Sequence, residues 1–243
     1  MQHSEIDNIS EVTNPGSGTG LDADEVSNEC CDLPCGKAAG RPRAADLESR
    51  MQNLVATAAS LFIEKGYSNV SLEMIAREAH VAVRTIYVKF GGKVGLFGAV
   101  LNNGRAHFFS NIGEMETDTR PIPQILSDFG MRFLSLVTAP ASLSLQRMVI
   151  AEAKTSPELA RTFFDTGPAQ TREVLTRFFA RTDIRAQLRE NIPYDLLPIH
   201  LINTILGDIF TMYLLEQEHR QSEDEIRFGL EQRLSLFYQA VLR

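Results

Sequence analysis

Apolar side chains recur every three or four residues from residue 46 onward, which is the spacing of one face of an α-helix. The first periodic segment ends at Gly66, a residue that readily takes the left-handed backbone found after many helix ends. Its apolar positions are Leu47, Met51, Leu54, Val55, Ala58, Leu61 and Phe62. The pattern therefore predicts a helix that begins near residue 46 and stops at Gly66.

Three shorter segments follow in the next forty residues. Ser71 is a good N-cap for a helix that turns Leu72, Ile75, Ala76 and Ala79 inward. After a break at His80 and Val81, a third helix is predicted over residues 82–88, and Gly91 and Gly92 separate it from a fourth. The apolar positions of the fourth helix are Leu96, Phe97, Val100, Leu101, Phe108 and Phe109.

The rest of the chain also has helical spacing. We predict helices over residues 125–137, ending at Pro140, and over residues 143–153. Thr155-Ser156-Pro157 starts another helix, which Gly167-Pro168 breaks. The helix after that break is lined by Val174, Leu175, Phe178 and Phe179. Two long segments complete the chain, residues 194–218 and a C-terminal helix that opens with the capping box Ser222-x-x-Glu225. Period-two alternation is absent, so the expected fold class is all-α.

The last two segments carry apolar residues on more than one side. Such helices must be buried on more than one face, either within a larger monomeric core or in a homodimer formed through a four-helix bundle. We favour the homodimer, because two-fold dimers are the commonest oligomers. The apolar residues concerned are Leu201, Ile202, Ile205, Leu206, Ile209, Phe210, Tyr213 and Leu214, then Leu230, Leu234, Leu236, Phe237, Tyr238, Val241 and Leu242.

The net charge of −7 is unevenly distributed. Residues 1–36 carry −8, residues 37–105 carry +5 and residues 106–243 carry −4. The basic block coincides with the first short helices. Small or branched residues at Ala76, Ala79, Val81 and Ile86 would let two of these helices cross closely, as in a helix-turn-helix. Charge asymmetry of this kind indicates a nucleic-acid partner.

Residues 1–40 are polar, acidic and rich in Gly and Ser, so we interpret them as a disordered tail. Cys30, Cys31 and Cys35 lie there, and they are either free thiols or a thiol or metal sensor; a zinc site would need about four ligands, and we expect no metal site and no cofactor. No secretory signal and no apolar run of membrane-spanning length is visible, which predicts a cytoplasmic protein without a membrane partner.

A family resemblance rests on many separate positions. The run Ala58-Ala59-x-Leu61-Phe62-x3-Gly66-Tyr67-x3-Ser71-x3-Ile75-Ala76 is followed by Thr85-Ile86-Tyr87-x2-Phe90-x2-Lys93-x2-Leu96-Phe97. Over residues 41–101 the chain closely resembles the N-terminal domain of TetR-family transcriptional regulators. The stretch 146–181 is also similar to members that control drug-efflux genes. The resemblance implies a DNA-binding domain over residues 41–92 and an α-helical ligand-binding and dimerisation domain over residues 93–243.

The resemblance also implies DNA contacts that the chemistry of the side chains suits. Residues 82–87 would enter the major groove, where Arg84 could bind guanine, while Tyr87 and Lys93 would contact phosphates. Gly40-Arg41-Pro42-Arg43 would form a flexible basic arm that runs along the DNA. The full set of expected DNA-binding residues is Arg41, Arg43, Ser71, Ala82, Val83, Arg84, Thr85, Tyr87, Lys89 and Lys93.

Two positions depart from the family pattern. His80 stands where a turn glycine is common, so either His80 takes a left-handed backbone or the turn differs. Gly92 and Val94 replace the usual cap and acid before the fourth helix, which weakens its start.

The second half is rich in phenylalanine, which suits either plain core or an apolar cavity with a few polar groups that orient a ligand. We expect a small hydrophobic effector to occupy such a cavity and change the spacing of the two recognition helices of a dimer. The expected effector-binding residues are Phe129, Phe133, Arg147, Glu152, Phe163, Phe178, Asn203 and Asp208.

Two other functional classes remain as alternatives. An all-α enzyme is disfavoured, because the sequence has no nucleophile elbow, His-Glu-x-x-His, P-loop or Glu-x-x-His pair. A helical interaction or sensor protein without specific DNA binding would leave the basic block unexplained. The sequence therefore predicts a homodimeric regulator, not an enzyme, that acts as a repressor on a palindromic DNA operator and is released by its effector.

Overall fold

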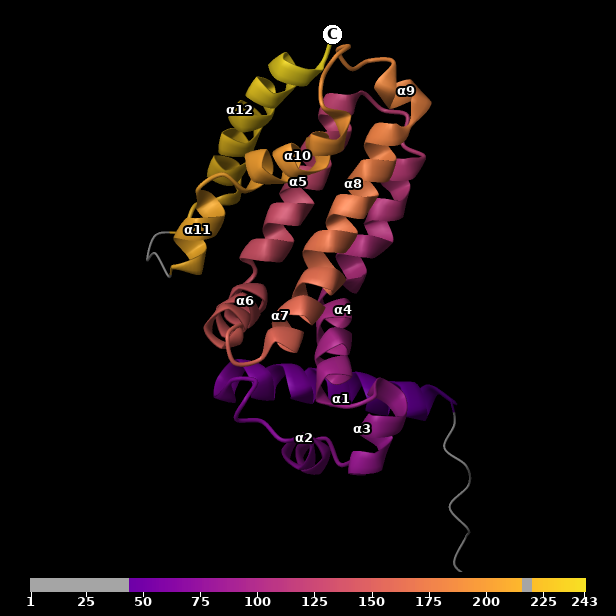
Figure 1. Cartoon of the computed structure of the whole chain (residues 1–243), viewed down its shortest axis with the longest axis vertical. Helices are drawn as coiled ribbons and strands as arrows, with labels where there is room; N and C mark the ends of the chain where they lie inside the picture. Colours follow the sequence, from indigo (N-terminus) through magenta and orange to yellow (C-terminus); the bar gives the residue numbers. More distant parts are fainter. Residues whose placement is uncertain (1–43, 216–219) are drawn as a thin grey trace, which may run out of the picture. The chain divides into compact units, whose positions relative to one another are not determined.

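The computed structural model describes residues 44–215 and 220–243, and these residues form an all-α structure (Figure 1). No strand occurs among them, which confirms the predicted fold class. The predicted tail, with its three cysteines, and Arg41 and Arg43 lie outside the described residues. The helices are α1 (Ala44–Lys65), α2 (Leu72–Glu78), α3 (Val83–Phe90), α4 (Lys93–Ile112), α5 (Ile122–Thr138), α6 (Pro140–Glu152), α7 (Pro157–Phe164), α8 (Gln170–Ala180), α9 (Thr182–Arg185), α10 (Leu197–Leu206), α11 (Ile209–Leu214) and α12 (Glu223–Val241), with short turns η1 (Gly113–Glu116), η2 (Asp165–Ala169) and η3 (Tyr194–Leu196).

The first three helices pack with the beginning of α4 around one apolar core. Phe62 of α1, Ile86 of α3 and Phe97 of α4 are all fully buried there. The rings of Phe62, Phe97 and Tyr67 lie 5.3 to 5.9 Å apart between centroids, in tilted and edge-on arrangements that aromatic pairs prefer. The predicted helical periodicity of residues 46–65 thus marks the face of α1 that holds α2 and α3 in place.

Helix α4 contributes to two hydrophobic clusters. Its first half, with Leu96 and Leu101, belongs to the core of α1–α3, together with Met148 of α6 and Leu159 of α7. Its second half supplies Phe108 to the other cluster, which is built mainly from α5, α8, α10 and α12. A single rigid element therefore links the N-terminal helices to the helices predicted to bind an effector.

The structure differs from the sequence prediction at two places, the first of which is the predicted break after α7. Gly167-Pro168 does not end the helix; a π-helical turn, η2, connects α7 to α8. A proline lacks the backbone N–H and clashes with the preceding turn of an α-helix, and a widened π turn relieves both problems. The sequence alone favoured a break because Gly and Pro usually end helices.

The predicted long segment 194–218 is also wrong as one helix, because the chain breaks between α10 and α11. Gly207 there has a φ of +50°. Arg233 of α12 donates hydrogen bonds to the carbonyl oxygens of Thr204 (2.9 Å) and Ile205 (3.1 Å), which the end of α10 leaves unpaired. A side chain from another helix thus stabilises the break.

The predicted capping box at the start of α12 is confirmed. The Ser222 hydroxyl accepts from the Glu225 N–H, and the Glu225 carboxylate accepts from the Ser222 N–H at 2.7 Å. Two orphan N–H groups of the helix start are satisfied in this way.

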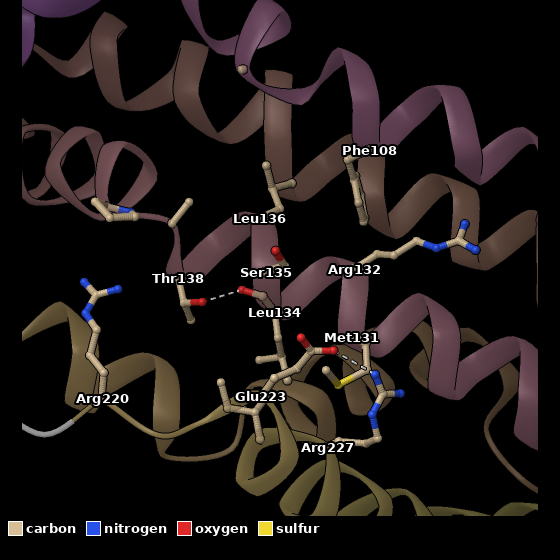
Figure 2. Close-up of a pocket in the computed structure, with 14 residues that line it drawn as sticks. Phe108, Met131, Arg132, Leu134, Ser135, Leu136, Thr138, Arg220, Glu223 and Arg227 are labelled. Carbon is tan, nitrogen blue, oxygen red and sulfur yellow. Dashed lines mark hydrogen bonds and ion pairs between the residues drawn. The ribbon is translucent and has the colours of Figure 1, made fainter.

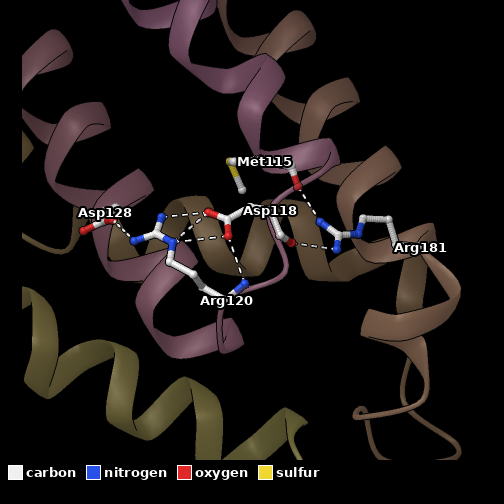
Figure 3. Close-up of polar contacts among 5 residues, drawn as sticks. All are labelled: Met115, Asp118, Arg120, Asp128 and Arg181. Atoms are coloured by element: carbon white, nitrogen blue, oxygen red, sulfur yellow. Dashed lines mark hydrogen bonds and ion pairs between the residues drawn. The ribbon is translucent and has the colours of Figure 1, made fainter.

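The connection between α4 and α5 is held by a polar network (Figure 3). The Arg120 guanidinium pairs with Asp118 at 2.7 Å and with Asp128 at 2.8 Å. Arg181 donates to the carbonyl oxygens of Met115 and Asp118 from the end of α8. The hydrogen bonds from Arg120 lower the pKa of Asp118 below its usual value. The network fixes where the chain leaves α4.

Candidate nucleic-acid interface

The turn between α2 and α3 has the geometry of a helix-turn-helix. Ser71 caps α2 by accepting a hydrogen bond from the Met74 N–H at 3.1 Å. His80 has a φ of +53°, so it takes the left-handed backbone rather than changing the turn. The chain then re-enters the core at Val81, whose N–H donates to the Ala76 carbonyl at 2.9 Å. The turn directs α3 outward from the core.

Helix α3 is anchored by Ile86 and presents its other side to solvent. Ile86 is fully buried. Ala82 is the extended N-cap, Arg84 and Lys89 are exposed, and Val83 and Thr85 are partly exposed. Tyr87 is 57% exposed. All of the expected contact residues of this helix are therefore accessible together on one short element.

Sequence reasoning missed Val88, which is 72% exposed on the same helix. Val88 follows the buried Ile86 by two residues, a spacing that places it off the apolar face of the helix. That spacing is the sequence signal that could have identified Val88. A methyl-bearing side chain can contact the thymine methyl group in the major groove.

Lys93 begins α4 beside the aromatic core of the N-terminal helices. Its Nζ lies 4.2 Å from the centroid of the Tyr67 ring. Partial burial lowers the pKa of Lys93, and the nearby Glu152 carboxylate acts in the opposite direction. Burial, followed by the charges of Glu158 and Glu152, raises the pKa of Tyr67 to about 12. Lys93 is thus held in place by an aromatic face at the positive end of a 20-residue helix.

Glu152, expected to orient an effector, lies elsewhere. At the end of α6 its carboxylate accepts hydrogen bonds from the Ser68 N–H at 2.8 Å and from the Ser68 hydroxyl. The space for this contact depends on Gly66, since a Cβ there would lie 3.0 Å from Glu152 Oε1. Glu152 therefore joins α6 to the loop between α1 and α2.

Of the other expected effector residues, Phe129, Phe133 and Phe178 belong to the cluster built mainly from α5, α8, α10 and α12. The rings of Phe129 and Phe133 are stacked with centroids 5.7 Å apart, and Phe178 is fully buried against Phe179. Arg147 donates to the carbonyl oxygens of Leu214 (2.8 Å) and Tyr213 (2.7 Å). The side chains of Asn203 and Asp208 are exposed. The structure therefore pairs Phe129 with Phe133 but does not bring the full set together.

Two neighbouring cavities lie between α4 and α5. The larger, of about 780 Å³, is lined by Phe108, Met131, Arg132, Leu134 and residues at the start of α12 (Figure 2). The smaller, of about 50 Å³, is lined by Arg105 and by Phe163, the one expected effector residue found on either wall. Gly104 and Leu136 line both cavities. Sequence reasoning missed Arg105, because its burial depends on helices distant in the chain.

Two family models match the chain in order. Residues 54–100 match the model described as bacterial regulatory proteins of the tetR family, and residues 124–240 match the C-terminal domain of AefR-like transcriptional repressors. The chain belongs to the TetR family of transcriptional regulators. Members of this family are ligand-responsive DNA-binding repressors rather than enzymes, and they bind operators as dimers. No curated protein matches the sequence.

Solved structures of other TetR-family regulators have the same fold. A regulator from Mesorhizobium loti is 23% identical, with a TM-score of 0.68 over 84% of this chain and all of that one. The flavonoid-responsive regulator FrrA is 22% identical, with a TM-score of 0.62 over 80% of this chain and 98% of its own. NalD, the secondary repressor of the MexAB-OprM multidrug efflux pump in Pseudomonas aeruginosa, is 24% identical, with a TM-score of 0.57 over 82% of this chain and 98% of its own.

Two further observations concern this TetR-family chain as the structure describes it. Within residues 44–215 and 220–243, no single helix is long and apolar enough to cross a membrane, although α5 and α6, bent by 62°, pass the same test as a pair. No group of three metal-binding side chains occurs in the same residues.

Proposed function

We propose that this protein is a homodimeric repressor that binds a palindromic operator through α3 and is released by a small hydrophobic effector. The observation that carries the proposal is the exposed face of α3, where Arg84, Tyr87 and Lys89 stand on a helix fixed by the fully buried Ile86. A short, rigid helix with cationic and hydrogen-bonding side chains suits the major groove.

In this proposal the contacts divide into two classes. Arg84 and Val88 read base edges, since an arginine binds guanine and an apolar side chain contacts the thymine methyl. Ser71, Thr85, Tyr87, Lys89 and Lys93 contact the backbone and set the register of the protein on the duplex. Ala82 and Val83 begin the helix and have no bulky side chain to keep it from the groove. Arg41 and Arg43 would extend the basic surface along the DNA.

The dimer is proposed to form through α12 and its neighbours. Phe228 and Leu236, two turns apart on α12, are 67% and 69% exposed. Large apolar side chains left open on one helix favour burial against a second copy. Two-fold symmetry would place two copies of α3 about 34–36 Å apart, the separation of successive major grooves on one side of the duplex.

Effector release is proposed to act through α4 and α6. Helix α4 reaches from Lys93, at the DNA-binding helices, to Gly104 and Phe108 on the cavity walls. Glu152 connects α6 to the loop before α2. A ligand that binds one arrangement of these helices more tightly would shift the spacing of the two α3 helices and weaken operator binding.

The test is selection of bound duplexes from a random pool, followed by competition titration with the selected site. The proposal expects a two-fold symmetric consensus and loss of preference at one base pair in Arg84→Ala. Arg172→Ala, which removes an exposed arginine from α8, is the matched control and should bind as the wild type does. Enrichment of no sequence would favour an interaction protein without specific DNA binding.

A further inference from the structure

The side chain of Arg105 is mostly buried, and no hydrogen bond or ion pair to it occurs within the described part of the chain. It stands on α4, and its Nη1 atom has neither exposed surface nor a hydrogen-bond acceptor there. The guanidinium carbon lies 5.6 Å from the centroid of the Phe163 ring. On its other side is Gly167 in η2, where any side chain would overlap the guanidinium. The site is thus shaped around the arginine head group.

Arginines elsewhere in the structure show which hydrogen-bond acceptors a guanidinium group finds in this protein. Arg147 donates to two carbonyl oxygens, and Arg233 does the same. Arg181 pairs with Asp183 at 2.6 Å in addition to its carbonyl acceptors. Burial lowers the pKa of Arg105, and no acidic group raises it. Leaving a buried cation unpaired is costly, so the site favours an anion supplied from outside the chain.

The cavity beside Arg105 has room for such an anion. Its volume of about 50 Å³ is several times the roughly 10–15 Å³ that a cavity needs to hold one water. Ser142 and Gln146 add polar groups to the wall, while Val100, Leu101 and Leu145 make the rest apolar. A planar carboxylate matches the two parallel N–H groups of a guanidinium.

A residue without a side chain stands on the walls of both cavities. Gly104 lines both cavities, and a Cβ there would meet no atom within 4 Å. Glycine inside a helix costs about 0.5–1 kcal/mol relative to alanine, and here it leaves open space at a position that both cavities share. The larger cavity has Phe108, Met131 and Leu134 on its wall (Figure 2).

We propose that Arg105 binds the carboxylate of the effector, which is a monocarboxylic acid with an apolar body that extends past Gly104 into the larger cavity. The inference rests on the proposed function, because it takes the ligand-responsive domain of a repressor as the place where the acid acts. It replaces Arg147, Glu152, Asn203 and Asp208 as the polar group that orients the effector.

Direct binding without DNA tests the proposal. Calorimetric titration of the full chain would compare decanoate and 4-phenylbutyrate with decan-1-ol and decylamine, which have similar bodies and a neutral or cationic end. The acids should bind, and Arg105→Met should weaken them about 10- to 100-fold, the effect of losing hydrogen bonds to a charged group. Arg172→Met, which removes an exposed arginine of α8 that lines neither cavity, should leave acid binding within about twofold.

Other variants keep the test decisive. Arg105→Lys retains the charge but loses the paired N–H groups, so it should bind the acids more weakly than the wild type and more tightly than Arg105→Met. Gly104→Leu should abolish the binding of decanoate, because the new side chain blocks the path of its long body. Acetate, which has no such body, should still bind beside Arg105. Arg105→Met should melt no lower than the wild type, since it removes an unpaired buried charge.

Equal binding of acid and alcohol, or undiminished acid binding in Arg105→Met, would overturn the proposal. So would the absence of acid binding together with a lower melting temperature for Arg105→Met, which would mean that water satisfies the arginine. Because these titrations contain no DNA, such a failure leaves selection of an operator untouched and is distinguishable from failure of the repressor function.

Discussion

The contact between Glu152 and Ser68 yields a quantitative prediction about how the two parts of the regulator are joined. Glu152→Ala removes two hydrogen bonds, from the N–H and the hydroxyl of Ser68. A hydrogen bond to a charged group contributes about 1.5–3 kcal/mol when shielded, and less near solvent, where Ser68 lies. We therefore expect the free energy of unfolding to fall by about 1–2 kcal/mol, or roughly 2–4 °C per kcal/mol for a chain of this size.

Glu158→Ala is the matched control for this change. Glu158 also lies close enough to Tyr67 to affect its pKa, so its removal changes the local charge in the same way. Its carboxylate makes no hydrogen bond within the described residues that the substitution would remove. Denaturant and thermal unfolding of the two variants, with Ser68→Ala and the double variant completing a cycle, would measure the contact itself. Equal stability of Glu152→Ala and Glu158→Ala, or a coupling energy of zero, would refute the reasoning.

Three further predictions concern the DNA-binding helices and the loop after α4. Lys93→Ala should weaken binding to all DNA sequences alike and reduce the slope of log K against log salt by about 0.9; an effect on one sequence only would contradict a phosphate contact. His80→Gly should raise the free energy of unfolding by up to about 1 kcal/mol. A left-handed backbone costs a non-glycine residue about 1–2 kcal/mol, and the greater freedom of glycine in the unfolded chain offsets part of the gain from removing that cost. Destabilisation of His80→Gly in denaturant unfolding would disprove this. Asp118→Asn should destabilise at pH 7, since the pKa of Asp118 is lowered in the folded state, and the difference from wild type should shrink as the pH falls below about 4; a pH-independent difference would exclude the charge of Asp118 as the cause.

The features that sequence reasoning predicted well depend on neighbours in the chain. The Ser222 capping box and the Ser71 cap each join atoms three residues apart. The left-handed stop at Gly66 likewise follows from one residue's backbone preference, and its φ is +80°. Helical periodicity located the main segments for the same reason, since it reports one face of one element.

The features that were missed depend on distant parts of the chain. The break after α10 is stabilised by Arg233, 28 and 29 residues from the carbonyls it contacts. The carboxylate of Glu152 pairs with a loop 84 residues away. The phenylalanine content of the second half does not show which rings belong to the core and which line a cavity. The structure places Phe178 in the core and Phe163 beside Arg105. Helix periodicity carries no information on such pairings.

The central claim is that α3 reads a specific operator. Selection from a random duplex pool, followed by titration of wild type, Arg84→Ala and Arg172→Ala against the selected site and its single-base variants, tests it most directly. We predict a symmetric site, a loss of about 1–3 kcal/mol of discrimination at one base pair per half-site in Arg84→Ala, and no change in Arg172→Ala. A pool that yields no consensus, or an Arg84→Ala profile identical to that of the wild type, would contradict the assignment of α3 as the reading helix.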